Sequence, residues 1–210
     1  MARPLDAIAA FHNAFRRDIA LIDAAAVALA RGHQGAGQTM DRFRFFNEML
    51  VWHADGEEAA TFPLLERLDP LLPDPYIQDH HGLDAAYDSL SAAVDAADLL
   101  ETARATAAFK FFLNVHLNKE DRQVYPLLAE QIPMDEQKQA VGTMSGMVPR
   151  ERFPEVIAWI FPLLGPVDRQ NLVQVFQMLM PPEAFAPVQG LIKGTVGDDD
   201  WATLSRVLSA

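Results

Sequence analysis

Two segments of the chain contain the same arrangement of a histidine and a glutamate. His53 is followed four residues later by Glu57, and His116 is followed four residues later by Glu120. Residues four apart lie on one face of an α-helix, so each segment can present an imidazole and a carboxylate together. Nitrogen and oxygen donors in this combination are typical of metal sites.

The similarity between the two segments extends beyond these pairs. Phe62-Pro63-Leu64-Leu65 follows the first pair and Tyr125-Pro126-Leu127-Leu128 follows the second, with no change of spacing. We therefore interpret the segments as two copies of one helical element, each contributing one histidine and one glutamate.

Two further histidines are predicted to face a helical core. Apolar or aromatic residues stand at positions −3, +3, +7 and +10 from both His12 and His80, which places both on a core-facing stripe. The same offsets from His81 give Gln78, Asp84, Asp88 and Ser91, a solvated face. His33 lies in a glycine-rich stretch and is predicted to be an exposed loop residue.

Four inward imidazoles and two carboxylates indicate a bound cation. A single histidine on an apolar face is more often a core residue, but the joint pattern favours metal, because burying so many polar groups without a cation is costly. The donor set suits iron, and manganese or zinc less well. Two carboxylates that can bridge suggest a dinuclear centre with positions left open for water, O2, peroxide or NO.

Composition excludes several other classes of site and partner. The 210 residues carry a formal net charge of −12, which disfavours nucleic acid and anionic membranes as partners. The absence of cysteine excludes disulfides, thiolate zinc sites, iron–sulfur clusters and cysteine nucleophiles. No apolar stretch approaches the ~20 residues of a membrane span. A soluble, cytoplasmic protein is therefore expected.

Helical periodicity predicts an all-α fold built on an up-down-up-down four-helix bundle. Gly32 is expected to cap the end of the first helix, and Thr39, Asp74 and Asp98 to cap the starts of the next three. The four long helices are expected over 5–29, 39–68, 74–97 and 98–131.

After Pro133 the sequence pattern changes, because the helical runs become shorter and are separated by glycine and proline. These runs are predicted at about 135–144, 151–164, 168–180, 183–192 and 198–208. We expect residues 1–145 to form the bundle domain and residues 146–210 a C-terminal helical extension that packs on the bundle or presents a surface for a protein partner or for self-association.

These motifs resemble the hemerythrin-like family, whose HHE cation-binding domain is a four-helix bundle around a non-haem di-iron centre. The matching elements are Phe11-His12, Trp52-His53 with Glu57, Asp79-His80 with Leu83, and His116 with Glu120, together with the two Pro-Leu-Leu segments. The resemblance covers about residues 1–145. The proline-broken tail also resembles an extension found in some bacterial members and in plant iron-regulatory relatives.

The resemblance implies two irons bridged by the glutamates and by an oxo or hydroxo group. The implied ligands are His12, His53, Glu57, His80, His116 and Glu120. Oxygen-carrying members have two histidines one turn apart on the third helix, whereas Tyr76 and Asp84 stand one turn from His80 here. Solvent or a Tyr76 phenolate is expected to complete the coordination, and simple reversible O2 carriage is disfavoured.

Three functions follow from this resemblance. The first is binding or reduction of O2, peroxide or NO, with catalase-like decomposition of hydrogen peroxide as its enzymatic form and no catalytic residue beyond the metal ligands. The second is an O2, NO or iron sensor that acts through the C-terminal helices. The third, iron buffering, is disfavoured because the sequence contains no signature of a storage cage.

Overall fold

The computed structural model describes residues 2–208, and every regular element in that range is helical, which confirms the predicted all-α fold. The chain divides into two compact units. One comprises residues 15–126 and the other residues 1–14 together with 127–210.

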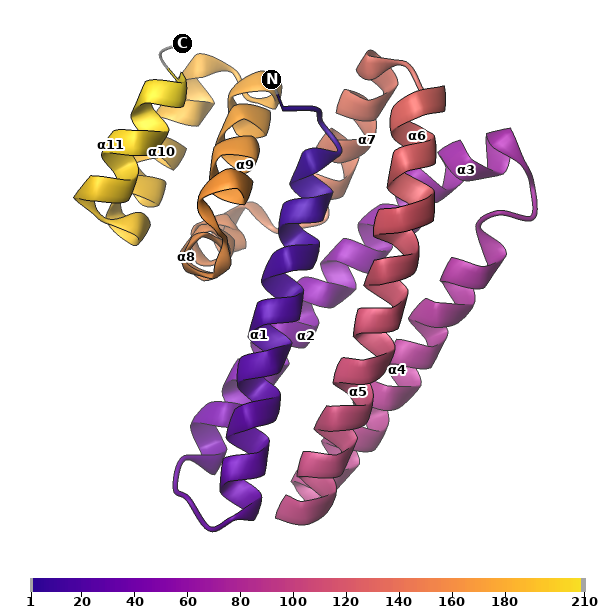
Figure 1. Ribbon diagram of the computed structural model, residues 1–210, viewed down its shortest axis with the longest axis vertical. Helices are drawn as coiled ribbons and strands as arrows, with labels where there is room; N and C mark the ends of the chain where they lie inside the picture. Colours follow the sequence, from indigo (N-terminus) through magenta and orange to yellow (C-terminus); the bar gives the residue numbers. More distant parts are fainter. Residues whose placement is uncertain (1, 209–210) are drawn as a thin grey trace. The chain divides into compact units, whose positions relative to one another are not determined.

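The unit of residues 15–126 is built on four long helices that alternate in direction (Figure 1). These are α1 (Asp6–Ala30) from Phe15 onward, α2 (Ala36–Gly56), α4 (Asp74–Asp95) and α5 (Leu99–Lys119). α1 and α4 match their predicted ranges to within a few residues, whereas α2 and α5 each end twelve residues before the predicted ends at 68 and 131.

Both predicted long helices that carry a His/Glu pair contain a widened turn. The π-helical turn η1 (Glu57–Thr61) separates α2 from α3 (Phe62–Leu68), and η2 (Glu120–Val124) separates α5 from α6 (Tyr125–Gln131). Proline causes a steric problem in an α-helix, because it lacks an amide N–H and its ring clashes with the carbonyl four residues earlier. Pro63 and Pro126 follow the two turns, and the extra residue in each turn accommodates them.

The helix termini confirm two of the predicted caps and correct two others. Gly32 follows α1 with a φ of 91°, and the Asp98 carboxylate accepts a hydrogen bond from the Glu101 amide at 2.9 Å. Thr39 is not a cap, because α2 already begins at Ala36 after the left-handed Gly35. Asp74 is the first residue of α4 and makes no capping hydrogen bond.

An aromatic core fills the bundle between the helices. Phe15 contacts Phe46 edge-on with ring centroids 5.5 Å apart, and Phe109 lies 5.6 Å from Phe43 and 6.3 Å from Phe46. All four rings are buried. Edge-to-face contacts of this kind contribute beyond the area that the rings bury, and they bring α1, α2 and α5 together on one side of the histidines.

The second unit contains the start of α1 and the C-terminal helices. Phe11 packs against Trp159 with ring centroids 6.2 Å apart, and the Asn13 amide donates to Asp168 at 3.2 Å. No helix within residues 2–208 is both long and apolar enough to cross a bilayer. After α6, the helices are α7 (Met134–Ser145), the short 3-10 turn η3 (Arg150–Arg152), α8 (Phe153–Leu163), α9 (Pro166–Leu179), α10 (Pro182–Val196) and α11 (Asp198–Leu208).

Candidate metal centre

The two glutamates of the repeated segments occupy equivalent positions, each at the first residue of a π-helical turn. The carbonyl of Glu57 accepts a hydrogen bond from the amide of Phe62, and the carbonyl of Glu120 accepts one from the amide of Tyr125. These hydrogen bonds close the wide turn in both copies. Both glutamate side chains are fully buried. π-helical turns are rare and often mark functional positions.

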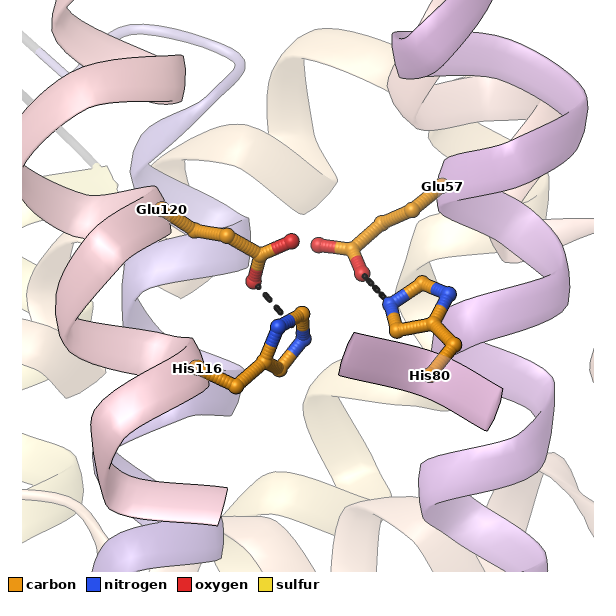
Figure 2. Close-up of side chains that lie close together, drawn as sticks. All are labelled: Glu57, His80, His116 and Glu120. Atoms are coloured by element: carbon orange, nitrogen blue, oxygen red, sulfur yellow. Dashed lines mark ion pairs between the residues drawn. The ribbon is translucent and has the colours of Figure 1, made fainter. Parts of the chain in front are cut away.

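Glu57, His80, His116 and Glu120 converge on one point inside the bundle. One ligand atom from each residue lies within 4.8 Å of the others. Figure 2 shows the two carboxylates directed toward each other, each beside an imidazole. Nε2 of His80 lies 3.5 Å from Glu57 Oε2, and Nε2 of His116 lies 3.3 Å from Glu120 Oε2.

The other ring nitrogens of these two histidines face carboxylates outside the cluster. Nδ1 of His80 lies 2.7 Å from Glu58, and Nδ1 of His116 lies 3.4 Å from Asp79, which is itself paired with Lys119. A metal-binding histidine usually has such a carboxylate on its second nitrogen, which fixes the ring and raises its basicity. Both Nε2 atoms are thereby directed at the site.

His53 lies next to this cluster. Its Nε2 is 3.1 Å from Oε1 of Glu57, and its ring meets Phe15 edge-on at 5.3 Å. His12 is fully buried on α1, three residues before Phe15. It belongs to the unit of residues 1–14 and 127–210, and its role as a ligand stays a prediction from the sequence.

Tyr125 contacts the site although its sequence position alone did not predict this role. Its hydroxyl donates a hydrogen bond to Oε1 of Glu57. Among the matched positions of the two copies it is the one that differs, because the first copy has Phe62 there. Phe62 instead stacks on the ring of His80 with centroids 5.4 Å apart.

Four other polar side chains, Tyr76, Asp121, His33 and His81, lie outside the cluster. The hydroxyl of Tyr76 donates to Gln123 at 3.0 Å, and burial, followed by the charges of Glu120 and Asp79, raises its pKa, which disfavours a phenolate. Asp121 pairs with Arg16 at 2.5 Å. His33 and His81 are exposed.

The buried acidic groups of this site strongly favour a bound proton or cation over an uncompensated negative charge. Burial raises the pKa of Glu120 well above its usual value, and the charge of Glu57 raises it further. Burial and Glu57 likewise raise the pKa of Tyr125 well above its usual value. Burial lowers the pKa of His80, but the nearby carboxylates of Glu57 and Glu58 outweigh it, so the net shift is upward.

The donor set fits a metal ion on chemical grounds. Two buried carboxylates so close together repel each other, and a cation between them removes both that repulsion and the cost of burying them. Imidazole with carboxylate suits iron, zinc or manganese. A cation held by these residues would compensate the negative charge of the two carboxylates.

Comparison with known proteins supports the same interpretation. Residues 3–77, about a third of the chain, match the family described as "Hemerythrin HHE cation binding domain". This part of the chain is similar to hemerythrin HHE domains. The matched range contains His12, His53 and Glu57, whereas His80, His116 and Glu120 lie beyond it and are brought together with Glu57 in the structure.

Two plant relatives extend the similarity beyond that range. A BRUTUS-like zinc finger protein of Arabidopsis thaliana is 24% identical over 207 residues, which cover 94% of this chain and 16% of the relative. Zinc finger protein BRUTUS of the same organism is 24% identical over 180 residues, 82% of this chain and 14% of the relative. The chain thus spans a small part of the length of these relatives, and no solved structure matches it.

Proposed function

We propose that the hemerythrin-like bundle binds two iron ions and uses them to bind or reduce a small oxygen species, namely O2, peroxide or NO. The observation that carries the proposal is the buried convergence of Glu57, His80, His116 and Glu120, with a carboxylate on the outer nitrogen of each histidine. Such a set of donors binds cations and leaves room for exogenous ligands.

The surroundings of Glu57 support a pair of ions rather than one. Its Oε1 faces His53 at 3.1 Å and its Oε2 faces His80 at 3.5 Å, so the two oxygens of one carboxylate point to imidazoles from different helices. A carboxylate placed in this way can bridge two metals, as in other bundle proteins with dinuclear centres. His12 is the remaining predicted nitrogen ligand.

Iron would supply the electrons that are exchanged with the bound species and the charge that stabilises reduced oxygen. The protein's own contribution is to orient ligands and to limit water. Phe15 and Phe62 pack on His53 and His80, and the Tyr125 hydroxyl holds its proton toward Glu57. Hydrogen peroxide decomposition is the enzymatic form of this proposal.

Metal content and absorption spectra test the proposal directly. Protein produced with iron should contain about two irons per chain, with near-ultraviolet bands that change when peroxide is added. His12→Ala should lower the iron content if His12 is a ligand. One zinc per chain, or no metal after anaerobic reconstitution with Fe²⁺, would contradict the proposal, and peroxide turnover by the isolated protein would establish the enzymatic form.

A sensor is the second candidate, and one observation favours it. Phe11 and Asn13, the neighbours of His12 on α1, contact Trp159 of α8 and Asp168 of α9. A shift of α1 on metal binding would therefore act directly on the C-terminal helices. Metal loading should then slow hydrogen exchange in α8 and α9, and unchanged exchange in both helices would remove the support for sensing.

A further inference from the structure

A cavity of about 110 Å³ opens beside α2 and α4 and leads to the histidines of the site. Its inner end is lined by His53, His80 and His116. Leu50 and Leu83, both buried, form apolar walls. A cavity of this size holds several water molecules, so a small solute can pass through it.

The outer part of this cavity is acidic. Asp55, Glu58 and Asp84 line it and are exposed, and no lysine or arginine among the described residues does so. Glu58 faces His80, whereas Asp55 and Asp84 have no ion-pair partner in the part of the chain that the structure covers. Asp79 and Asp121, which lie near the site but outside the cavity, pair with Lys119 and Arg16.

A buried donor group meets the cavity at its inner end. His80 is only 5% exposed, and its Nε2 makes no hydrogen bond, although the atom lies 3.5 Å from Glu57. Its Nδ1 pairs with Glu58 in the acidic outer part of the cavity, and its Nε2 faces Glu57 in the interior. Imidazole nitrogen is a good ligand for divalent transition metals.

We propose that this cavity is the route by which a divalent cation reaches the centre, with Asp55 and Asp84 attracting the ion and His80 receiving it. The inference rests on the proposed metal-binding function. Carboxylates at the mouth of a cleft with apolar walls concentrate cations there and speed their association. The same charges disfavour small anions, so neutral molecules such as O2, NO and hydrogen peroxide pass more readily than azide.

The test is the rate at which the metal-free chain of 210 residues takes up Co²⁺, followed by its visible absorption. Asp55→Asn combined with Asp84→Asn should slow uptake roughly three- to tenfold at low ionic strength and flatten its salt dependence. The final amount of bound metal should stay unchanged. Asp88→Asn combined with Asp95→Asn is the matched control, because both residues are exposed on α4 outside the cavity.

A second variant tests the route without changing charge. Val51 lines the cavity and is 39% exposed, so Val51→Phe adds bulk without disturbing the core. It should slow uptake at every ionic strength. If neither the Asp55/Asp84 variant nor Val51→Phe loads more slowly than wild type, the access route is refuted while metal binding stands. If the wild-type protein binds neither Co²⁺ nor Fe²⁺, the proposed function itself fails.

Discussion

Tyr125 donates its hydroxyl proton in a hydrogen bond to Oε1 of Glu57, so the second copy of the repeated segment stabilises the glutamate of the first. Tyr125 is buried, as is Glu57. The two copies are therefore not equivalent, because Phe62 at the matching position of the first copy has no hydroxyl and stacks on His80. The two copies therefore contribute matching His/Glu pairs to the site, but the aromatic side chains that contact these pairs differ between the copies.

Tyr125→Phe should destabilise the metal-free protein by about 1.5–3 kcal/mol, because a buried carboxylate loses a charge-assisted hydrogen bond. It should also weaken metal binding roughly tenfold or more, since Glu57 is then less firmly oriented. Urea unfolding and competition with a chelator measure the two effects. Tyr76→Phe is the control, because that hydroxyl bonds to Gln123 instead of a predicted ligand, and equal losses in both variants would contradict the argument.

Asp79→Asn should lower the equilibrium affinity for metal by about 10- to 100-fold while the fold is retained. The carboxylate faces Nδ1 of His116 at 3.4 Å, and its loss makes the imidazole a weaker and less oriented ligand. Metal titration of the variant measures this effect. Asp88→Asn, which removes the same charge from the exposed face of α4, should bind metal as the wild type does.

The metal-free protein should become less stable as the pH rises from about 5.5 to 8. Glu120 has a pKa raised above 4.5, chiefly by burial, so the folded state holds a proton that the unfolded chain releases at lower pH. The raised pKa of His80 acts in the same direction above pH 6.5. Stability gained from these protons is therefore lost as the pH passes through the folded-state pKa values.

Glu120→Gln isolates the contribution of the glutamate to this pH dependence. The amide has a similar shape but does not titrate, so the free energy of unfolding of this variant should vary less with pH than that of the wild type. Chemical unfolding at several pH values gives the comparison. A wild-type stability that rises over this range, or an unchanged slope in Glu120→Gln, would show that Glu120 is not the group responsible.

His80→Ala and His81→Ala form an internal pair, since the residues are neighbours on α4 and differ in exposure. His80 is 5% exposed and lies in the cluster, whereas His81 is exposed. The first variant should lose most bound metal, and the second should retain it. Metal analysis of the purified variants measures both effects. Comparable losses of metal in the two variants would show that the assignment of His80 as the ligand is wrong.

The all-helical fold and the inward placement of the predicted donor residues followed from periodicity and spacing. An amphipathic helix must bury its apolar stripe, so a histidine on that stripe, such as His80, is carried inward, whereas His81 is left on the exposed face. Helix existence is a local property, which explains why α4 and α5 begin within a residue of their predicted starts. The sequence therefore determined which side chains are presented to the interior.

The tertiary structure decided how these side chains meet. The hydrogen bond from Tyr125 to Glu57 joins residues far apart in sequence, and the π-helical turns at Glu57 and Glu120 depart from the α-helical period, so periodicity predicted neither feature. The assignment of Glu58 to Nδ1 of His80 likewise depends on how α2 and η1 pack against α4. Spacing fixes direction around one helix, but distances between helices arise only when the aromatic core has packed.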